Sequence, residues 1–318
     1  MKHIEKNRTA YFLLVLANVI WGGNFVIGRL GAEYFPPITF SLLRWSVAFL
    51  LLTPFMVRPV LRDSKVLWSY KWIILLLSVT GVAGYNTIIY YSLHFTTSIN
   101  ASIVNSATPL FIAIFSFFML KERLSVLQAT GIFLSVIGII FIISKGSFET
   151  LQAFKLNLGD LFVLVAVVSW SIYSIVIKKY SKILPAFTTL YVTSFVGILI
   201  LFPLSLLEIM QTDAAVTFNL ESLLILGYVG CFASIVAFIS WNTGVAKIGA
   251  AKSGIFINLL PVFATLFAIV FTEEDLLWYQ IAGGFIVILG VMLSSRKNGT
   301  ALQKLSKPVT VTKNFEKR

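Results

Sequence analysis

Long runs of apolar residues without charge recur along this chain of 318 residues, and they decide its fold class. A helix needs about 20 apolar residues to cross a hydrocarbon core that is roughly 30 Å thick. The runs are continuously apolar, whereas a strand of a membrane barrel would alternate apolar and polar residues. The sequence therefore predicts an all-α integral membrane protein. The ten expected transmembrane helices are 11–30, 38–57, 72–92, 98–119, 126–144, 159–178, 187–207, 221–243, 250–271 and 277–295.

Composition supports this prediction, because 58% of the residues are hydrophobic and only 12% are charged. A soluble domain carries about 25% charged residues. The net charge of +12 would suit nucleic acid, but its distribution does not. If the N-terminus is cytoplasmic, 21 of the 25 basic residues fall on the cytoplasmic side. The positive-inside rule then predicts a multi-pass protein of the cytoplasmic membrane with both termini in the cytoplasm and no nucleic-acid partner.

The two halves of the sequence repeat each other. With an offset of 152 residues, Pro109 falls on Pro261 and Glu122 on Glu274; with an offset of 149, Trp21 falls on Trp170. Each half holds five spans, so the second half must enter the membrane from the opposite side. Inverted repeats are typical of secondary transporters, whose binding site lies at the repeat interface. The expected parts are a cytoplasmic N-terminus (1–10), a first repeat (11–144), an extracytoplasmic connection (145–158), a second repeat (159–295) and a cytoplasmic basic tail (296–318).

These paired landmarks resemble the EamA-type permeases of the drug/metabolite transporter superfamily. The first half carries Trp21-Gly22-Gly23-Asn24-Phe25, later Arg44, and then Lys121-Glu122-Arg123-Leu124. The resemblance covers roughly residues 11–295. It implies a ten-helix permease of the bacterial cytoplasmic membrane, usually an exporter of metabolites or drugs. We therefore expect a secondary transporter of small organic metabolites, such as amino acids, that works by alternating access.

Four polar residues share one depth, roughly 9–10 Å beneath the outer surface at 1.5 Å per helical residue. They are Asn24, Arg44, Asn86 and Asn105. Arg44 is suited to bind a carboxylate or phosphate through paired hydrogen bonds. It is equally suited to anchor helices or to extend toward the outer headgroups. The three asparagines either line a substrate path or bond helices to one another.

Aromatic residues near the midplane are the next candidates for substrate binding. Trp21 and Trp170, with Tyr173 alongside and Tyr85 near Asn86, form either the walls of a pocket or ordinary helix packing. Trp241 is predicted to be an anchor at the inner interface. Asn258 is a further candidate in the inner half.

Glycine and proline mark the remaining features of the spans. Pro109 and Pro261 fall mid-span, where proline kinks a helix, and the kinks either gate the path or only shape the bundle. Two glycine pairs, each seven residues apart, predict close helix contact. They are Gly131 with Gly138 and Gly283 with Gly290.

Other function classes fit the residues less well. A membrane enzyme needs clustered His, Asp, Glu or Cys, and the chain has two separated histidines and one cysteine. We expect no metal site, no cofactor and no enzyme activity, and no carboxylate deep enough to carry a proton. A membrane scaffold or receptor stays open as the alternative. The expected partners are a small-molecule substrate and the lipid bilayer, and the oligomeric state is not predicted.

Overall fold

The computed structural model describes residues 2–120, 126–149, 157–212 and 216–295. Within these ranges every regular element is a helix. The first half consists of α1 (Lys2–Gly31), α2 (Pro37–Ser69), α3 (Lys71–Leu77), η1 (Ser78–Gly84), α4 (Tyr85–Ser92), α5 (Ser98–Asn105), α6 (Thr108–Leu120) and α7 (Val126–Ile143). The second consists of α9 (Leu158–Tyr180), α10 (Ala186–Thr212), α11 (Leu220–Gly227), η2 (Tyr228–Val236), α12 (Ala237–Ile248), α13 (Ala250–Gly254), η3 (Ile255–Leu259), α14 (Leu260–Phe271) and α15 (Trp278–Ser295).

Seven of the helical segments are long and apolar enough to cross a membrane. Three shorter apolar helices, Ala129–Ile142, Phe256–Phe271 and Trp278–Gly290, stand at the other predicted spans. The chain is therefore a multi-pass membrane protein, whereas the count of ten spans stays a prediction. Glu122 and the basic tail at 296–318 lie outside the described residues.

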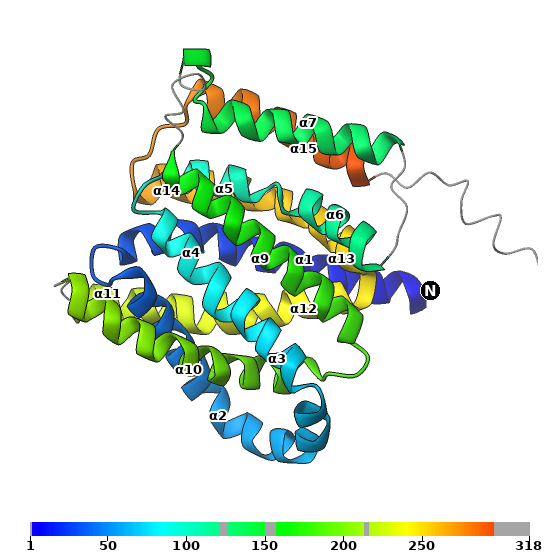
Figure 1. The fold of residues 1–318 in the computed structure, drawn as a ribbon, viewed down its shortest axis with the longest axis vertical. Coiled ribbons are helices and arrows are strands. Elements are labelled where there is room, and N and C mark those ends of the chain that lie inside the picture. Colours follow the sequence, from blue (N-terminus) through cyan, green and yellow to red (C-terminus); the bar gives the residue numbers. More distant parts are fainter. Residues whose placement is uncertain (1, 121–125, 150–156, 213–215, 296–318) are drawn as a thin grey trace, which may run out of the picture.

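The helices lie side by side in a bundle, from α2 and α10 at one edge to α7 and α15 at the other (Figure 1). We call the end of the bundle near the N-terminus the proximal end and the opposite end the distal end. Arg29, near the end of α1, donates a hydrogen bond to the Thr96 carbonyl at 2.8 Å. A Cβ added at Gly159, at the start of α9, would lie 2.9 Å from the Thr96 nitrogen. The matching helices α1 and α9 therefore run in opposite directions.

Two π-helices, η1 and η2, occupy matching positions in the two halves. A π turn is wider than an α turn and is frequent at functional sites. A tryptophan of the first half donates a hydrogen bond to a backbone carbonyl of each π-helix. Trp45 Nε1 donates to Val82 O at 3.0 Å, and Trp21 Nε1 donates to Ala233 O at 3.1 Å. The wide turns are thereby fixed to adjacent helices.

The two mid-span prolines follow breaks in the helices. Pro109 lies in the first turn of α6, directly after the turn at Ser106–Ala107, and Pro261 lies in the first turn of α14, after η3. Proline is well tolerated in a first turn, because the N–H group that it lacks would have no partner within the helix. These prolines therefore begin new helices. A gating movement at the breaks remains a prediction.

Helices α7 and α15 approach each other through the predicted glycines. A Cβ added at Gly138 would lie 2.8 Å from Val287 N, and one at Gly290 would lie 2.6 Å from Gly131 O. Only a residue without a side chain lets two backbones come this close. The predicted close contact is confirmed, and it is a contact between the two halves.

Candidate functional site

Arg44 lies at the centre of a hydrogen-bond network and is fully buried. Its Nη1 donates to Asn24 Oδ1 at 3.0 Å and to Tyr90 Oη at 2.6 Å. Nε donates to Ser234 Oγ at 2.6 Å, and Nη2 donates to Ala233 O at 3.1 Å. Asn24 and Tyr90 come from the first half, whereas Ala233 and Ser234 belong to η2 of the second. Arg44 therefore joins the two halves and does not extend to the headgroups.

All four acceptors around Arg44 are neutral. The described part of the chain contains two ion pairs, and neither involves Arg44. A buried charge without a partner of opposite sign is costly, and the dipoles of hydroxyl and carbonyl groups offset only part of this cost. The cluster consequently carries an uncompensated positive charge in the interior of the bundle. That charge would favour an anionic group of a ligand.

An aromatic group adjoins Arg44. The rings of Trp21 and Trp170 meet edge to face at 5.2 Å, and Tyr173 stacks on Trp170 at 4.9 Å. The Trp241 ring lies 5.6 Å from Trp21 and 5.9 Å from Trp170, and it is fully buried. The prediction of Trp241 as an interfacial anchor is therefore wrong. Gly244 explains its place, because it leaves room for a side chain of α1 and lets α12 lie close against that helix.

The polar and aromatic groups form one continuous cluster. Ala233 O accepts hydrogen bonds from both Arg44 and Trp21, so the two groups share a carbonyl. Tyr85 packs 4.9 Å from Trp170 and donates to Asn105 Oδ1 at 3.2 Å. We call this set the central cluster. Its members are Trp21, Asn24, Arg44, Tyr85, Tyr90, Asn105, Trp170, Tyr173 and Trp241.

Two predicted site residues stand apart from the central cluster. The Asn86 amide donates to Gly81 O at 3.1 Å, so it bonds to its own wide turn. Asn258 lies on η3, and neither its amide nitrogen nor its amide oxygen has a protein partner within the described residues. A buried amide without partners is costly. Asn258 therefore remains available to a ligand or to a different arrangement of the helices.

Sequence reasoning missed several polar groups beside the aromatic residues. Asn18 Oδ1, Ser174 Oγ and Trp241 Nε1 are all buried and have no protein partner in the described part of the chain. Asn18 precedes Trp21 by three residues and Ser174 follows Trp170 by four, so each shares a helix face with its tryptophan. This spacing was visible in the sequence. The unpartnered groups lie on the proximal side of the tryptophan pair.

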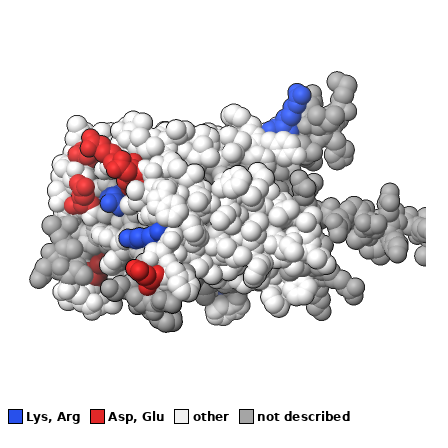
Figure 2. Space-filling view, turned by 90° about the horizontal axis from the view of Figure 1, so that it is seen from above, with Lys and Arg blue, Asp and Glu red and all other residues white. Residues whose placement is uncertain are grey.

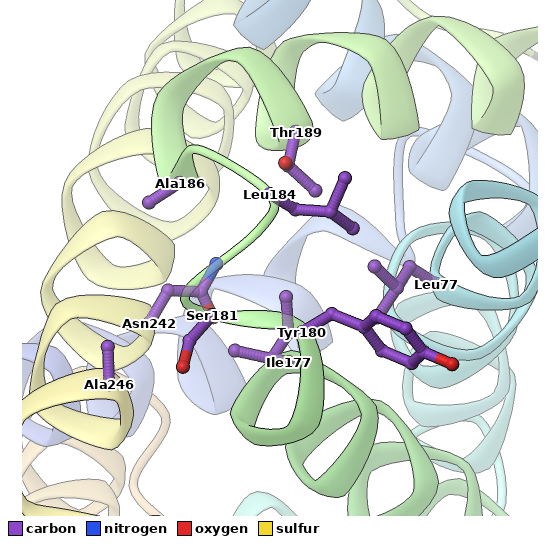
Figure 3. A pocket seen from close by; sticks show the side chains of 9 residues that line it. All are labelled: Leu77, Ile177, Tyr180, Ser181, Leu184, Ala186, Thr189, Asn242 and Ala246. Carbon is purple, nitrogen blue, oxygen red and sulfur yellow. The ribbon is translucent and has the colours of Figure 1, made fainter. Parts of the chain in front are cut away.

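A small cavity lies farther toward the proximal end (Figure 3). Its volume is about 30 Å³, and its walls come from α3, α9, α10 and α12. Asn242 lines it and donates to Tyr173 Oη of the central cluster at 2.9 Å. Thr189 also lines it, and the buried Thr189 hydroxyl has no protein partner among the described residues. The cavity therefore adjoins the central cluster through the hydrogen bond between Asn242 and Tyr173.

A larger groove of about 390 Å³ lies between α5, α14 and α15. Leu266, Ile281 and Phe285 line it, and each is more than half exposed on the outside of the bundle. Pro261 also lines it, but no member of the central cluster does. The groove faces the membrane rather than the centre of the bundle.

Asp160 is a carboxylate that is almost completely buried although it stands at the end of a span. Asp160, in the first turn of α9, is 1% exposed. It accepts hydrogen bonds from Thr96 Oγ1 at 2.7 Å and from the Asn100 amide. Both partners belong to the other half of the chain and cover Asp160 only after folding, whereas the prediction concerned depth in the membrane, and this stays a prediction. Asp160 lies at the distal end of α9, ten residues before Trp170 of the central cluster on the same helix.

Comparison with known proteins gives one consistent family. The model of the EamA-like transporter family matches residues 8–144 and again residues 157–296. The chain is 28% identical to the uncharacterized transporter YyaM of Bacillus subtilis, over 93% of this chain and 95% of that protein. It is 27% identical to an uncharacterized transporter of Archaeoglobus fulgidus, over 92% and 99% respectively. A crystal structure with a TM-score of 0.62 and 19% identity covers 95% of this chain and all of the other, and it shares the fold.

Proposed function

The chain belongs to the EamA-like transporter family, and on that premise we propose that it is a secondary transporter of small organic metabolites. The substrate binds at the central cluster, between two inverted repeats. Alternating access then exposes this site to either side of the membrane. The distal end is extracytoplasmic, and both termini lie in the cytoplasm, as the distribution of basic residues predicts.

One observation carries the proposal: Arg44 bonds to both halves and shares the Ala233 carbonyl with Trp21. A ligand that displaces part of this network therefore changes how the halves are held together. Such coupling is what a carrier needs, because a ligand shifts a conformational equilibrium only through different contacts in the two states.

The chemistry of the cluster points to a substrate class. Arg44 supplies a positive charge for a carboxylate, whereas Trp21 and Trp170 offer faces to an apolar or aromatic part. Asn18 Oδ1 and Trp241 Nε1 add an acceptor and a donor that have no protein partner among the described residues. An amino acid with an apolar side chain meets these requirements. We propose export as the physiological direction, because this is usual in the resembled family.

The test is metabolite profiling of the medium from cells that overproduce the protein. In cultures that produce the Arg44→Gln variant, the exported metabolite should appear in the medium only at the background rate. The matched control is Arg58→Gln, which removes the same charge from an exposed position of the same helix. Membrane yield and thermal stability of the variant must be measured in parallel. Equal export by Arg44→Gln and the unmodified protein would rule out this site.

A further inference from the structure

The distal end is closed by carboxylates of the second half that bind helix starts of the first half. Glu208, near the end of α10, accepts hydrogen bonds from the backbone nitrogens of Ile38 at 3.0 Å and Thr39 at 2.8 Å. It also accepts from Thr39 Oγ1 at 2.9 Å. The first N–H groups of a helix have no partner within the helix and carry a partial positive charge. A carboxylate from another helix is therefore a strong partner for the start of α2.

A second carboxylate repeats this arrangement. Glu274, which precedes α15, accepts hydrogen bonds from the backbone nitrogens of Ser98 and Ile99, each at 3.0 Å. These residues begin α5. Arg29 Nε lies 3.5 Å from the same carboxylate. Glu274 therefore connects the second half to α1 and α5 of the first.

Asp160 adds a third contact between the halves, but through side chains: it accepts hydrogen bonds from the Thr96 hydroxyl and the Asn100 amide, and it is buried. We call Asp160, Glu208 and Glu274 the distal latch. Acidic residues gather at this end of the molecule, on the left in Figure 2. Other charged or titratable groups near the latch are Arg29, His94, Lys145 and Tyr279.

Within the described residues, the proximal counterpart of the Glu208 contact is weaker. Thr188 matches Thr39 at the repeat offset of 149 residues, and it lies in the first turn of α10. Its Oγ1 donates to Asp63 Oδ2 at 3.3 Å, whereas Thr39 donates to Glu208 at 2.9 Å. Among the described residues, Asp63 accepts no hydrogen bond from a backbone nitrogen at the start of α10. The counterpart of Glu274, which is Glu122, lies outside the described residues.

A column of aromatic rings leads from the distal latch to the central cluster. Phe218 lies 5.6 Å from Phe35, Phe35 stacks on Phe40 at 5.6 Å, and Phe40 lies 4.4 Å from Tyr90. Tyr90 in turn accepts a hydrogen bond from Arg44. Phe40 follows Thr39, whose backbone the latch holds. A movement of the α2 start away from Glu208 therefore shifts the Phe40 ring. This ring packs against Tyr90, which is a hydrogen-bond partner of Arg44.

We propose that the distal latch is the extracytoplasmic gate of the transporter, closed in this conformation, and that its carboxylates must release α2 and α5 before the outer side opens. The gate rests on the proposed transport function. Hydrogen bonds to an ionised acceptor are roughly twice as strong as those between neutral groups. Neutral glutamine at position 208 or 274 therefore weakens the closed form while it keeps the size of the side chain.

Accessibility of a buried cysteine tests the gate without any substrate. The reporter is Ser41→Cys in a Cys231→Ser background, so that it is the only thiol. Ser41 is buried between Thr39 and Arg44 on α2, and its hydroxyl has no protein partner within the described residues. A membrane-impermeant maleimide is added outside intact cells. Labelling should become about tenfold faster with Glu208→Gln and with Glu274→Gln. A tenfold larger open population corresponds to a closed form that is weakened by about 1.4 kcal/mol.

Asp63→Asn is the matched control, because it removes the equivalent carboxylate at the proximal end. It should leave labelling from outside unchanged. Unchanged labelling in both latch variants, with normal membrane yield and full labelling after denaturation, would overturn the proposal. Equal acceleration in the latch variants and in Asp63→Asn would overturn it too, because the effect would then be general loosening.

A reversible cross-link separates the gate from the transport function. Thr39 Oγ1 and Ser205 Oγ lie 2.8 Å apart on α2 and α10, so cysteines at both positions are close enough for a disulfide. In the Cys231→Ser background, oxidation should stop the efflux of a radiolabelled amino acid mixture, and reduction should restore it. Full efflux with the cross-link formed would refute the gate and leave transport intact. Absent efflux in every form would refute the proposed substrate class, and the labelling result would still decide the gate.

Discussion

The distal and proximal ends of the bundle are made of matching segments, yet they are held together to different degrees. At the distal end, Glu208 accepts three hydrogen bonds at the start of α2. At the proximal end, Asp63 meets the start of α10 through one hydrogen bond at 3.3 Å. Among the described residues, the difference lies in a few side chains. A duplicated fold can thus acquire a preferred conformation through a small number of carboxylates.

The largest expected effect concerns Arg44, which lies in the central cluster between the two ends. Arg44→Gln leaves Asn24, Tyr90, Ser234 and Ala233 without their shared donor. Each buried partner left unsatisfied costs about 1–3 kcal/mol. We expect metabolite efflux at the background level and a lower thermal midpoint, both measured on purified protein in liposomes. Normal efflux would show that the centre does not couple the two ends.

A loss of stability is expected from the α7–α15 contact, which extends from one end of the bundle to the other. This loss should not favour the opening of either end over the other. A Cβ added at Gly290 would lie 2.5 Å from Ser135 N and 2.6 Å from Gly131 O. Gly290→Ala should therefore cost about 1–3 kcal/mol through overpacking. The control is Gly227→Ala, where nothing lies within 4 Å of the added atom. Thermal unfolding in detergent measures both, and equal midpoints would contradict the close contact.

A moderate effect is expected from strengthening the proximal end. Asp63→Glu lengthens the carboxylate and lets it reach the free N–H groups at the start of α10, as Glu208 does for α2. One added hydrogen bond is worth about 0.5–1.5 kcal/mol, or roughly two- to tenfold in an equilibrium. Cysteine at Ala246, beside the proximal cavity, should then label more slowly in inside-out vesicles. Faster labelling would show that the comparison of the two ends is mistaken.

The smallest effect is expected from external pH. Burial lowers the pKa of the His94 imidazole, while the nearby Glu208 carboxylate acts in the opposite direction. Opening the distal end would return this pKa toward about 6.5, so the open form binds more protons than the closed form below that pH. Acidification from about pH 7.5 to about pH 5.5 should therefore raise the outside labelling rate of Ser41→Cys relative to the rate of the denatured protein at the same pH, a ratio that corrects for the loss of reactive thiolate. His94→Gln should reduce this effect of external pH on labelling. If the pH effect stays the same in His94→Gln, other titratable groups cause it.

Much of the fold follows from the sequence, because hydropathy is a local property. The apolar runs predict where helices lie, and the glycine spacing predicts the α7–α15 contact. The two π-helices were not predicted, since a wide turn leaves the hydropathy of a helix unchanged. The break before Pro109 was expected as a kink within a helix, whereas the chain ends one helix and begins another.

The candidate site was predictable only in part. Depth along the helices brought Asn24 and Arg44 to one level, and the structure joins them by a hydrogen bond. Tyr90 was missed because depth does not reveal which face of a helix turns inward. Glu208 was missed because its partners lie about 170 residues away in the sequence. Contacts between the two halves depend on how the repeats pack, which local patterns do not contain.

The acidic character of the distal latch has a consequence for biogenesis. Insertion machinery reads lysine and arginine near each span to orient a nascent helix, and aspartate and glutamate contribute little to that choice. A gate that pairs carboxylates with backbone N–H groups needs almost no basic residues on the translocated side. In the orientation that we propose, the chain can therefore close its distal end firmly without disturbing the signals that fix its topology during synthesis.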